Sequence, residues 1–281
     1  MQLDLRDRIV EPSYWPVVMG VLNVTPDSFS DGGRFVESDD AVTAALRMIA
    51  DGAAIVDVGP ESTRPGSSSV SVDEQISRAI PVIERIRTQD AAITVSIDTT
   101  SAKVARAAID AGADMINDTS ALRDDPAMAE VAARTGALLC LMHRRGMPAE
   151  MQLGGGPVYG DVIAEILAFL KERVELAAEA GIARERILID PGIGFGKRTE
   201  DNLAIMKNIN RFVELGHPVL IGASRKRFIG EVLGVDDPCD REAGSMTCAV
   251  LAAQAGAAIA RVHDVRATVE AIRLHKAIGG D

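Results

Sequence analysis

The sequence contains few cysteines and few aromatic residues. Its three cysteines, Cys140, Cys239 and Cys248, are odd in number and form no CxxC pair. Neither a disulfide framework nor a cysteine-rich zinc site is therefore expected. Aromatic residues make up 3% of the chain, which is too few for the stacking platforms that bind single-stranded nucleic acids.

An excess of basic residues is also missing. The formal net charge is −11 and the isoelectric point is about 4.9, which argues against broad contact with a nucleic acid or an anionic membrane. The segment MQLDLRDRIVEP mixes both signs of charge and has no apolar core, so it does not read as a secretory signal. The longest weakly polar run, AVLAAQAGAAIA from Ala249, is too short to span a bilayer. We expect a cytoplasmic protein that binds anions only locally.

What the sequence does contain is a regular alternation. Short apolar and β-branched runs alternate with longer stretches rich in Ala, Leu, Ile, Glu and Arg, which is typical of βα units around a parallel sheet. Eight such runs are predicted to be strands: residues 17–24, 54–59, 93–98, 114–118, 138–143, 187–192, 218–224 and 259–264.

The two kinds of connection between these elements differ in length. A glycine, the residue at which helices commonly end, stands just before six of the predicted strands, at Gly52, Gly112, Gly136, Gly181, Gly216 and Gly256. The connections that leave the strands include three long polar segments, 25–38, 60–72 and 144–160. Elaborate loops on one face predict a (β/α)₈ TIM barrel with its active site at the C-terminal ends of the strands. An open, doubly wound sheet is the alternative. We predict a lead-in segment at 1–16 and a single barrel domain at 17–281.

Polar side chains stand at or near the end of every predicted strand, namely Asn23, Asp57, Asp98, Asn117, His143, Asp190, Ser224 and His263. In a barrel they would face one mouth, although any one of them could instead cap the helix that follows. Asp98, Asn117 and Asp190 offer acceptors and one amide, which suit a flat heterocycle whose edge carries two parallel N–H donors. They indicate a guanine-like or pterin-like ring.

Positive charge gathers near the last two strands. The run SRKR occupies 224–227, and Arg261 and His263 belong to the eighth strand. Barrels commonly bind phosphate at the corresponding loops, so these cations in an acidic protein indicate a phosphorylated substrate. A solvated basic patch is the alternative.

The connection after the first strand carries oxygen ligands. The stretch NVTPDSFSDGG, residues 23–33, brings Asn23, Asp27 and Asp31 into one long polar segment, and such segments in compact domains are usually functional or mobile. Mg²⁺ keeps several waters and needs few protein ligands. These residues could therefore hold Mg²⁺ beside phosphate oxygens.

Three other features do not favour a binding role by themselves. The run DPGIGFG spaces its glycines as GxGxG rather than GxGxxG, which argues against a dinucleotide site. Tyr14 and Trp15 precede the first strand and are expected to plug the bottom of the barrel. Arg144 and Arg145 are as consistent with exposed loop positions as with ligand contacts.

In chain order, the strand ends carry the motifs GVLNVTPDSFSDGG, VDVGPESTRPG, SIDT, MINDTS, LMH, IDPGIGFGK, GASRKRFIG and RVHD. Together these motifs resemble the dihydropteroate synthase family, whose members join a pterin to p-aminobenzoate in the folate pathway. The resemblance extends from about Val17 to Ala277. It implies the barrel fold inferred above, Mg²⁺ as cofactor, small-molecule substrates and a homodimer.

The resemblance also implies roles for individual residues. It makes Asn23 the Mg²⁺ ligand, and it places diphosphate against Asn23, Arg261 and His263. The implied pterin site comprises Asp98, Asn117, Asp190, Phe195, Lys226 and Arg261. The implied p-aminobenzoate site comprises Phe29, Thr63, Arg64, Pro65 and Ser224. The implied catalytic residues are Asp98, Lys226, Arg261, His263, Asp31 and Arg64.

The reaction that the resemblance implies is substitution at the exocyclic methylene of the pterin. NVTPDSFSDGG and ESTRPG, residues 61–66, resemble two mobile loops that close over the bound diphosphate. The C–O bond would break with carbocation character before the aniline nitrogen attacks. Two departures from the family pattern are Pro60, where a glycine is usual, and HRRGMPAEMQ after the fifth strand.

Two other functions stay open. One is that of a methyltransferase domain which uses a similar barrel to bind a methylated folate, and the other is that of a catalytically inactive pterin-binding paralogue. The diphosphate-binding cations and the two loops argue against the first. The joint presence of Asn23, Arg64, Lys226, Arg261 and His263 argues against the second.

Overall fold

A computed structural model of the chain describes residues 3–5, 8–10, 16–25, 34–61, 70–146 and 156–279. Within these ranges, eight parallel strands form one sheet in the order β8-β7-β6-β5-β4-β3-β10-β9. Their bounds are β3 Val17–Asn23, β4 Ile55–Gly59, β5 Thr94–Asp98, β6 Met115–Asp118, β7 Leu138–Met142, β8 Ile187–Asp190, β9 Leu220–Ile221 and β10 Ile259–Val262.

The two ends of this sheet meet and close it into a barrel. Ile189 of β8 bridges Val219, which precedes β9, in parallel register. The Ile189 N–H donates to the carbonyl oxygen of Pro218 across 3.0 Å. The predicted (β/α)₈ barrel is confirmed, and the open doubly wound sheet is excluded.

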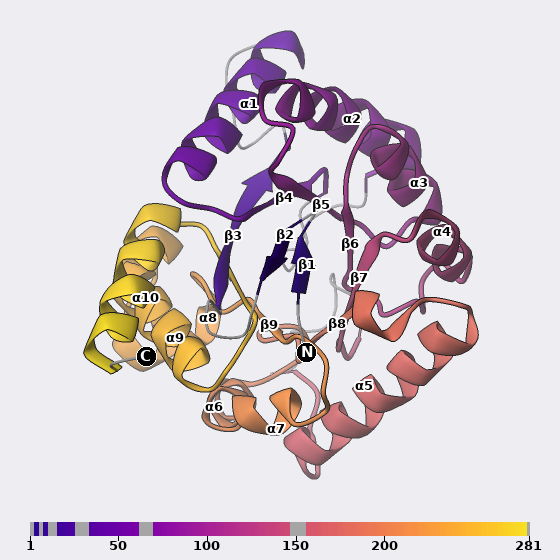
Figure 1. Cartoon of the computed structure of the whole chain (residues 1–281). Coiled ribbons are helices and arrows are strands. Elements are labelled where there is room, and N and C mark those ends of the chain that lie inside the picture. Colours follow the sequence, from indigo (N-terminus) through magenta and orange to yellow (C-terminus); the bar gives the residue numbers. More distant parts are fainter. Residues whose placement is uncertain are drawn as a thin grey trace.

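Helices surround the barrel on its outside (Figure 1). In chain order they are α1 Arg34–Ala50, α2 Val72–Gln89, α3 Ala102–Asp110, α4 Ala127–Thr135, α5 Val162–Glu179, α6 Thr199–Lys207, α7 Ile209–Val213, α8 Arg227–Leu233, α9 Glu242–Gln254 and α10 Val265–Gly279. Short 3₁₀ turns occupy Arg184–Arg186 and Pro238–Arg241. Each strand is thus followed by helix, as the alternation in the sequence predicts.

The strands are buried on both faces, which explains their near-continuous apolar runs. In β5, Val95 and Ile97 belong to the large core between strands and helices, whereas Ser96 and Asp98 alternate with them and point to the barrel interior. The half of the barrel interior near the N-terminal strand ends is apolar and includes Met19. The half near the C-terminal strand ends is polar, so the candidate site lies there.

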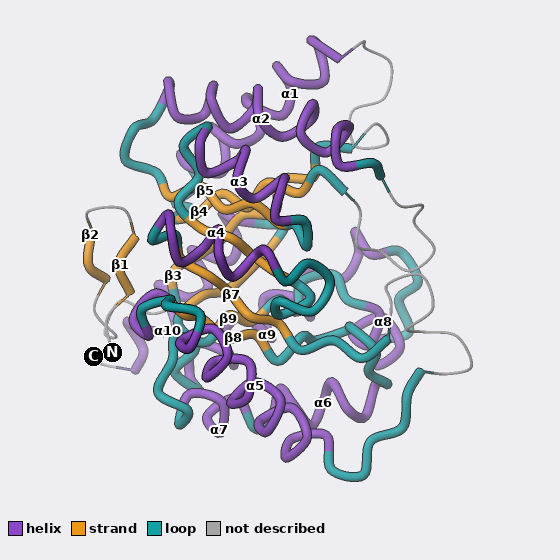
Figure 2. Tube along the Cα trace, turned by 90° about the vertical axis from the view of Figure 1, so that its right-hand side faces the viewer, coloured by secondary structure: helices purple, strands orange, loops and turns teal. Residues whose placement is uncertain are grey.

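A short hairpin covers the N-terminal end of the barrel (Figure 2). Its strands, β1 Leu3–Leu5 and β2 Arg8–Val10, pair antiparallel. Leu3 and Leu5 are 0% and 1% exposed and pack against the apolar interior cluster. The sequence did not predict this hairpin, and the expected plug residues Tyr14 and Trp15 lie outside the described residues.

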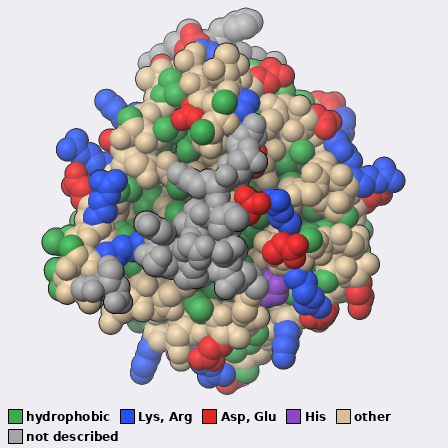
Figure 3. Space-filling model, in the orientation of Figure 1, with side chains coloured by type: hydrophobic (Ala, Val, Ile, Leu, Met, Phe, Trp, Pro, Cys, Tyr) green, Lys and Arg blue, Asp and Glu red, His purple; other side chains and the backbone are tan. Residues whose placement is uncertain are grey.

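The tight connections at the same end follow the predicted glycines. All six that precede strands adopt a positive φ, as helix-terminating glycines do: Gly52, Gly112, Gly136, Gly181, Gly216 and Gly256. Acidic and basic side chains are interspersed around the rim of the face seen in Figure 3. Among the described helices, none combines the length and apolar character needed to cross a membrane. The cysteines are all free.

Candidate active site

The C-terminal strand ends enclose a pocket of about 300 Å³, its open mouth included. Its lining consists of Asp98, Asn117, Thr119, Met142, Asp190, Ile193, Phe195, Gly222, Lys226 and Arg261. Six of these residues were assigned to a pterin site from the sequence: Asp98, Asn117, Asp190, Phe195, Lys226 and Arg261. The structure brings all six together. The other four are mostly small or apolar and carried no signal, although strand alternation alone would have directed Met142 inward.

Arg261 is the most constrained cation of the pocket. Its Nε donates to Oδ2 of Asp57 across 2.7 Å, and its Nη2 donates to Oδ2 of Asp98 across 2.9 Å. Burial alone would lower the pKa of Arg261, but the two carboxylates raise it above its ordinary value. The guanidinium is therefore permanently charged and is held by two strands other than its own.

The two carboxyl groups of the pocket have raised pKa values. Burial raises the pKa of Asp98 to about 7, with Arg261 opposing the shift and the Asp57 carboxylate adding to it. Burial raises the pKa of Asp190 to about 6, against the Gly192 N–H that donates to its Oδ1 across 2.6 Å. Buried carboxyls with raised pKa values in a pocket are typical of functional sites.

Lys226 and Phe195 form one wall of the pocket. The Lys226 ammonium lies 4.0 Å from the centroid of the Phe195 ring, which is within the range of cation–π contact. Burial lowers the pKa of Lys226 to about 8, and Arg261 lowers it further, while Asp190 and Asp98 act in the opposite direction. Phe195 also packs against Met142. Together these side chains present a flat apolar and cationic surface.

The predicted basic run SRKR divides between several partners. Arg225 forms a two-point ion pair with Asp264, and the exposed Arg227 pairs with Glu231 on its own helix. Of the three cations in the run, only Lys226 lines the pocket. The Ser224 hydroxyl lies 3.1 Å from Nδ1 of His263 and accepts the His263 backbone N–H across 3.3 Å. Ser224 and His263 thus form a pair.

His263 is neutral near pH 7 in this structure. Burial lowers its pKa to about 3, and the cations Arg261 and Arg225 lower it further. A neutral imidazole still donates one N–H. His263 can therefore act as a hydrogen-bond donor, and a bound anion would raise its pKa.

The glycine-rich run after β8 is shaped by close backbone contacts. Gly192 and Gly196 adopt φ values of +71° and +63°, and a Cβ at either position would lie about 2 Å from a carbonyl oxygen, that of His143 or of Arg145. Only glycine fits such an approach. The glycines therefore bring this loop, and Phe195 with it, against the end of β7. In the described part of the chain, these close backbone contacts account for Gly192 and Gly196.

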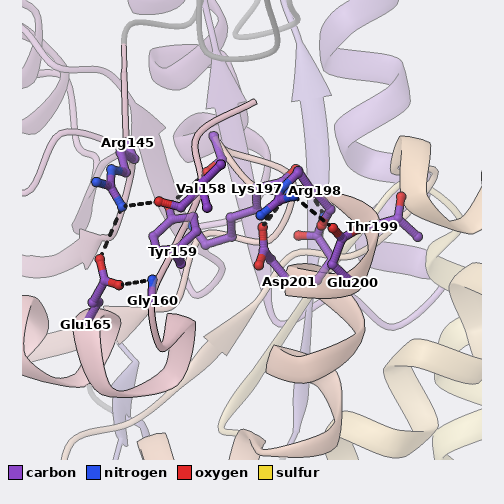
Figure 4. A network of polar contacts seen from close by, with 12 residues as sticks. Arg145, Val158, Tyr159, Gly160, Glu165, Lys197, Arg198, Thr199, Glu200 and Asp201 are labelled. Carbon is purple, nitrogen blue, oxygen red and sulfur yellow. Dashed lines mark hydrogen bonds and ion pairs between the residues drawn. The ribbon is translucent and has the colours of Figure 1, made fainter. Parts of the chain in front are cut away.

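Side chains around Tyr159 fasten the same loop (Figure 4). The Tyr159 hydroxyl donates to the carbonyl oxygen of Gly196 across 2.8 Å. The guanidinium of Arg145 lies 4.8 Å from the Tyr159 ring centroid, and it donates to Glu165 of α5 across 3.1 Å. Lys197, 2% exposed, donates to the carbonyl oxygen of Phe195 across 3.1 Å. These contacts hold the loop that carries Phe195, a residue of the pocket wall, on the side away from the pocket.

The prediction that His143 faces the mouth is wrong. Its ring lies edge-on to Phe169 at 4.9 Å, and its Nδ1 lies 3.0 Å from Nζ of Lys197. Because side chains alternate along β7, Met142 faces the pocket and His143 faces the helices. Burial lowers the pKa of His143 to about 2, with Lys197 adding to the shift.

The two arginines after β7 differ in exposure. Arg144 is 4% exposed and donates from Nη2 to both carboxylate oxygens of Asp124, across 2.6 and 2.8 Å. Arg145 is partly exposed and pairs with Glu165. Neither lines the pocket, so both are structural in the described part of the chain.

Several predicted residues lie outside the described residues. Phe29 and Asp31 fall within 26–33, and Thr63, Arg64 and Pro65 fall within 62–69. The ends of the second segment are joined, because Glu61 accepts the Val70 N–H across 2.9 Å. Pro60, the departure from the family pattern, accepts a hydrogen bond from Arg78 across 3.1 Å. Pro60 is buried and directly follows β4, which ends at Gly59.

Asn23 ends β3 at the rim of the site. A Cβ built on Gly59 would lie 3.6 Å from Oδ1 of Asn23 and 4.0 Å from Cβ of Asp98, so the three residues are neighbours. Among the described residues, no group of three or more His, Cys, Asp or Glu side chains could hold a metal ion. An amide oxygen fits a hard cation such as Mg²⁺, which needs few protein ligands when a phosphorylated substrate supplies the others.

The fold and the site define a (β/α)₈ barrel enzyme that binds a small polar ligand at the C-terminal ends of its strands. Two ionisable carboxyls, an amide, an ammonium and a guanidinium face one pocket. The chain belongs to the family described as "Pterin binding enzyme", whose sequence profile matches residues 19–263.

Similar proteins agree with this assignment. Dihydropteroate synthase of Escherichia coli (strain K12) is 48% identical over 262 residues, which cover 93% of this chain and 91% of the relative. A structure of Xanthomonas albilineans dihydropteroate synthase with 4-aminobenzoic acid is 47% identical, has a TM-score of 0.91, and covers 100% of this chain and 98% of that chain. Another, in complex with 7,8-dihydropteroate, is 44% identical with a TM-score of 0.89 and covers 100% of both chains. The resemblance predicted from the motifs is confirmed.

Proposed function

We propose that this chain catalyses the dihydropteroate synthase reaction. It condenses (7,8-dihydropterin-6-yl)methyl diphosphate with p-aminobenzoate to give 7,8-dihydropteroate and diphosphate. The observation that carries the proposal is the convergence of Asp98, Asn117, Asp190, Lys226 and Arg261 on one pocket. Its support is the high identity to dihydropteroate synthases, one of which has been solved with 7,8-dihydropteroate.

Asp190 reads the edge of the pterin ring in this proposal. Its pKa of about 6 leaves it ionised near pH 7, so it accepts two parallel N–H donors from the ring. Asn117 and Asp98 complete the polar edge. Phe195 and the Lys226 ammonium flank the ring, and Arg261 lies over its face.

The diphosphate lies against Arg261 and His263. Arg261 supplies a permanent positive charge, and His263 supplies an N–H donor whose pKa rises when the anion is bound. Asn23 would hold Mg²⁺ through its amide oxygen, and the bound ion would supply positive charge to the diphosphate oxygens. Activity should therefore be lost in excess EDTA and restored by Mg²⁺. Full activity in excess EDTA would contradict the metal assignment.

The chemical step is a substitution at the exocyclic methylene. The C–O bond breaks, and the departing diphosphate takes the electron pair while Arg261 and His263 stabilise its charge. The Asp98 carboxylate lies on the ring side and offsets the positive charge that develops on the pterin. The aniline nitrogen then forms the C–N bond with its lone pair, and one of its two protons passes to the departing diphosphate or to solvent. No covalent bond to the protein is needed.

The p-aminobenzoate site is assigned to Phe29, Thr63, Arg64, Pro65 and Ser224, with Asp31 and Arg64 as further catalytic residues. Of these, Ser224 is the one the structure describes, and its distance of 3.1 Å from Nδ1 of His263 supports a position near the proposed diphosphate site. The homodimer and the cytoplasmic location also remain predictions. Sedimentation velocity of the purified chain tests the first.

A product assay tests the proposal directly. The purified chain is incubated with the pterin diphosphate, p-aminobenzoate and Mg²⁺, and both dihydropteroate and released diphosphate are measured, with p-aminobenzoate omitted as the control. Equal amounts of both products are expected. A folded chain that binds pterin but forms no dihydropteroate would instead be the inactive paralogue, and transfer of a methyl group from a folate would indicate the methyltransferase.

A further inference from the structure

Asp57 holds two residues of the pocket without lining it. It is 0% exposed at the centre of β4. Its Oδ2 accepts from Nε of Arg261 across 2.7 Å and from Nδ2 of Asn117 across 3.1 Å. Both donors line the pocket, whereas Asp57 does not. One buried oxygen thus joins two side chains that contact the ligand in the proposed function.

The position of β4 in the barrel makes this possible. Strands run in the order β6-β5-β4-β3-β10, so Asn117 of β6 and Arg261 of β10 each lie two strands away, on opposite sides. Arg261 carries a long, flexible side chain whose ordering has an entropic cost. Contacts at Nε with Asp57 and at Nη2 with Asp98 leave its guanidinium a single orientation.

Asp57 also decides which end of the Asn117 amide is left for a ligand. Because Nδ2 donates to Asp57, the carbonyl oxygen Oδ1 is the free end of the amide. That Oδ1 is buried and has no hydrogen-bond partner among the described residues. A buried acceptor without a partner is costly unless a ligand supplies a donor.

We propose that Asp57 is a positioning residue for the transfer reaction: it orients Arg261 toward the ring and the leaving group, and it presents Asn117 to the ring as an acceptor. This inference rests on the proposed function. Asp57 touches neither substrate and acts through the two residues it holds. Replacing Asp57 should therefore weaken binding of the pterin and slow the reaction, while leaving p-aminobenzoate binding largely unchanged.

Two substitutions and a control separate this role from mere packing. Asp57→Asn keeps an oxygen that can accept from both donors but removes the charge, whereas Asp57→Ala removes both. Ser96→Ala is the matched control, because Ser96 lies opposite Asp57 in the sheet register, is 0% exposed, and has a hydroxyl without a partner among the described residues. Ser96 does not line the pocket.

Two methods provide the readouts. Calorimetry measures the affinity for pterin, which lacks the diphosphate, and steady-state kinetics measures turnover with both substrates. We expect Asp57→Asn to weaken pterin binding about 10-fold and Asp57→Ala about 30- to 100-fold, in line with lost charged hydrogen bonds and lost orientation. The Michaelis constant for p-aminobenzoate should stay within about twofold in all variants, as should every constant of Ser96→Ala. Partial rescue by Asn over Ala is the signature of positioning.

The inference is overturned if both Asp57 variants bind pterin and turn over as Ser96→Ala does. A wild-type chain that binds no pterin would instead contradict the proposed function itself. Should neither Asp57 variant fold, nuclear magnetic resonance of the ¹⁵N-arginine-labelled wild-type chain decides. The Arg261 Nε–H, identified by its absence in Arg261→Lys, should exchange slowly with solvent. Exchange as fast as that of Arg266, whose side chain is 76% exposed, would refute the contact.

Discussion

Nη2 of Arg261 lies 2.9 Å from Oδ2 of Asp98, and this pair joins β10 to β5 across the mouth of the barrel. Burial raises the pKa of Asp98 to about 7, and Arg261 is the main group that opposes this rise. Without the guanidinium, Asp98 would be protonated at neutral pH. Arg261 therefore keeps Asp98 partly ionised near pH 7. In the proposed function this leaves negative charge beside the ring and the positive guanidinium beside the leaving group.

Removal of Arg261 should damage catalysis severely. Arg261→Ala takes away the charge that faces the diphosphate in the proposed function, and the loss of such a contact costs about 2 to 4 kcal/mol, or about 30- to 1000-fold in turnover. Stopped assays of dihydropteroate formation measure this effect. Arg266→Ala on α10, which removes a side chain that is 76% exposed, is the control and should leave turnover unchanged. Comparable turnover in both variants would remove Arg261 from the mechanism.

Asp190→Asn should weaken pterin binding. The amide replaces one acceptor with a donor that faces a donor of the ring, so affinity should fall by about 2 kcal/mol or more. In the wild-type chain, affinity should likewise fall as the pH drops below about 6, because Asp190 then becomes protonated. Calorimetry at several pH values measures both effects. Unchanged affinity in a folded variant would place the ring elsewhere.

The Asp190 carboxyl should reduce the unfolding free energy of the ligand-free protein at neutral pH. Its pKa is 3.8 in the unfolded reference and about 6 in the folded chain, so the folded chain binds the proton more tightly. The resulting stabilisation is complete below about pH 4 and is lost as the pH rises through about 6. The difference in unfolding free energy between Asp190→Asn and wild type should therefore shift in favour of the variant between about pH 4 and about pH 8. The expected shift is on the order of 1 to 3 kcal/mol. Urea unfolding at both pH values measures the difference, and a gain that does not change with pH would refute it.

Gly192→Ala and Gly216→Ala separate backbone strain from steric conflict. Both glycines have positive φ values, +71° and +80°, but a Cβ on Gly216 meets nothing within 4 Å, whereas one on Gly192 would lie 1.8 Å from the carbonyl oxygen of His143. Gly216→Ala should cost about 1 kcal/mol of unfolding free energy. Gly192→Ala should cost clearly more and should weaken pterin binding, since it displaces the loop that carries Phe195. Equal losses of stability and equal pterin affinity would refute the role of the close contact.

Much of this site could be predicted because parallel strands bring their ends to one edge. The motifs placed Asp98, Asn117, Asp190 and Arg261 at strand ends, and closure of the barrel then brought them together. The motifs alone did not give the direction of each side chain, which depends on the alternation along each strand. Met142 and His143 are neighbours in the chain, yet the first faces the pocket and the second faces the helices.

The contact between Asp57 and Arg261 shows a second limit. The two residues are 204 positions apart in the chain, and their meeting depends on which strands are neighbours and in what register. No local pattern around Asp57 predicts its partner. The β1–β2 hairpin was missed for a different reason, because strands of three residues are too short to show an alternation.

The order of substrate binding gives the last expectation, which concerns the segments 26–33 and 62–69. Their sequences contain Gly32, Gly33 and Gly66, and ordering such residues costs about 1 to 2 kcal/mol each. Diphosphate and Mg²⁺ at the strand ends can offset this cost by contacting both segments, so that the p-aminobenzoate site forms only afterwards. Titration of p-aminobenzoate into the free protein should then give little heat, whereas titration with Mg²⁺, diphosphate and a pterin product analogue present should give measurable binding. Equal affinity under both conditions would show a preformed site.

Variants in the same segments test which substrate they serve. Phe29→Ala and Pro65→Ala should raise the Michaelis constant for p-aminobenzoate several-fold more than that for the pterin diphosphate, because the proposed contacts of these side chains are with the second substrate alone. Val158→Ala, at a position 70% exposed and away from the pocket lining, is the control and should change neither constant. If both constants rose together in Phe29→Ala and Pro65→Ala, the segments would contribute to the pterin site as well. Contacts of the segments with the pterin ring, rather than with diphosphate, would then have to explain why p-aminobenzoate binds second.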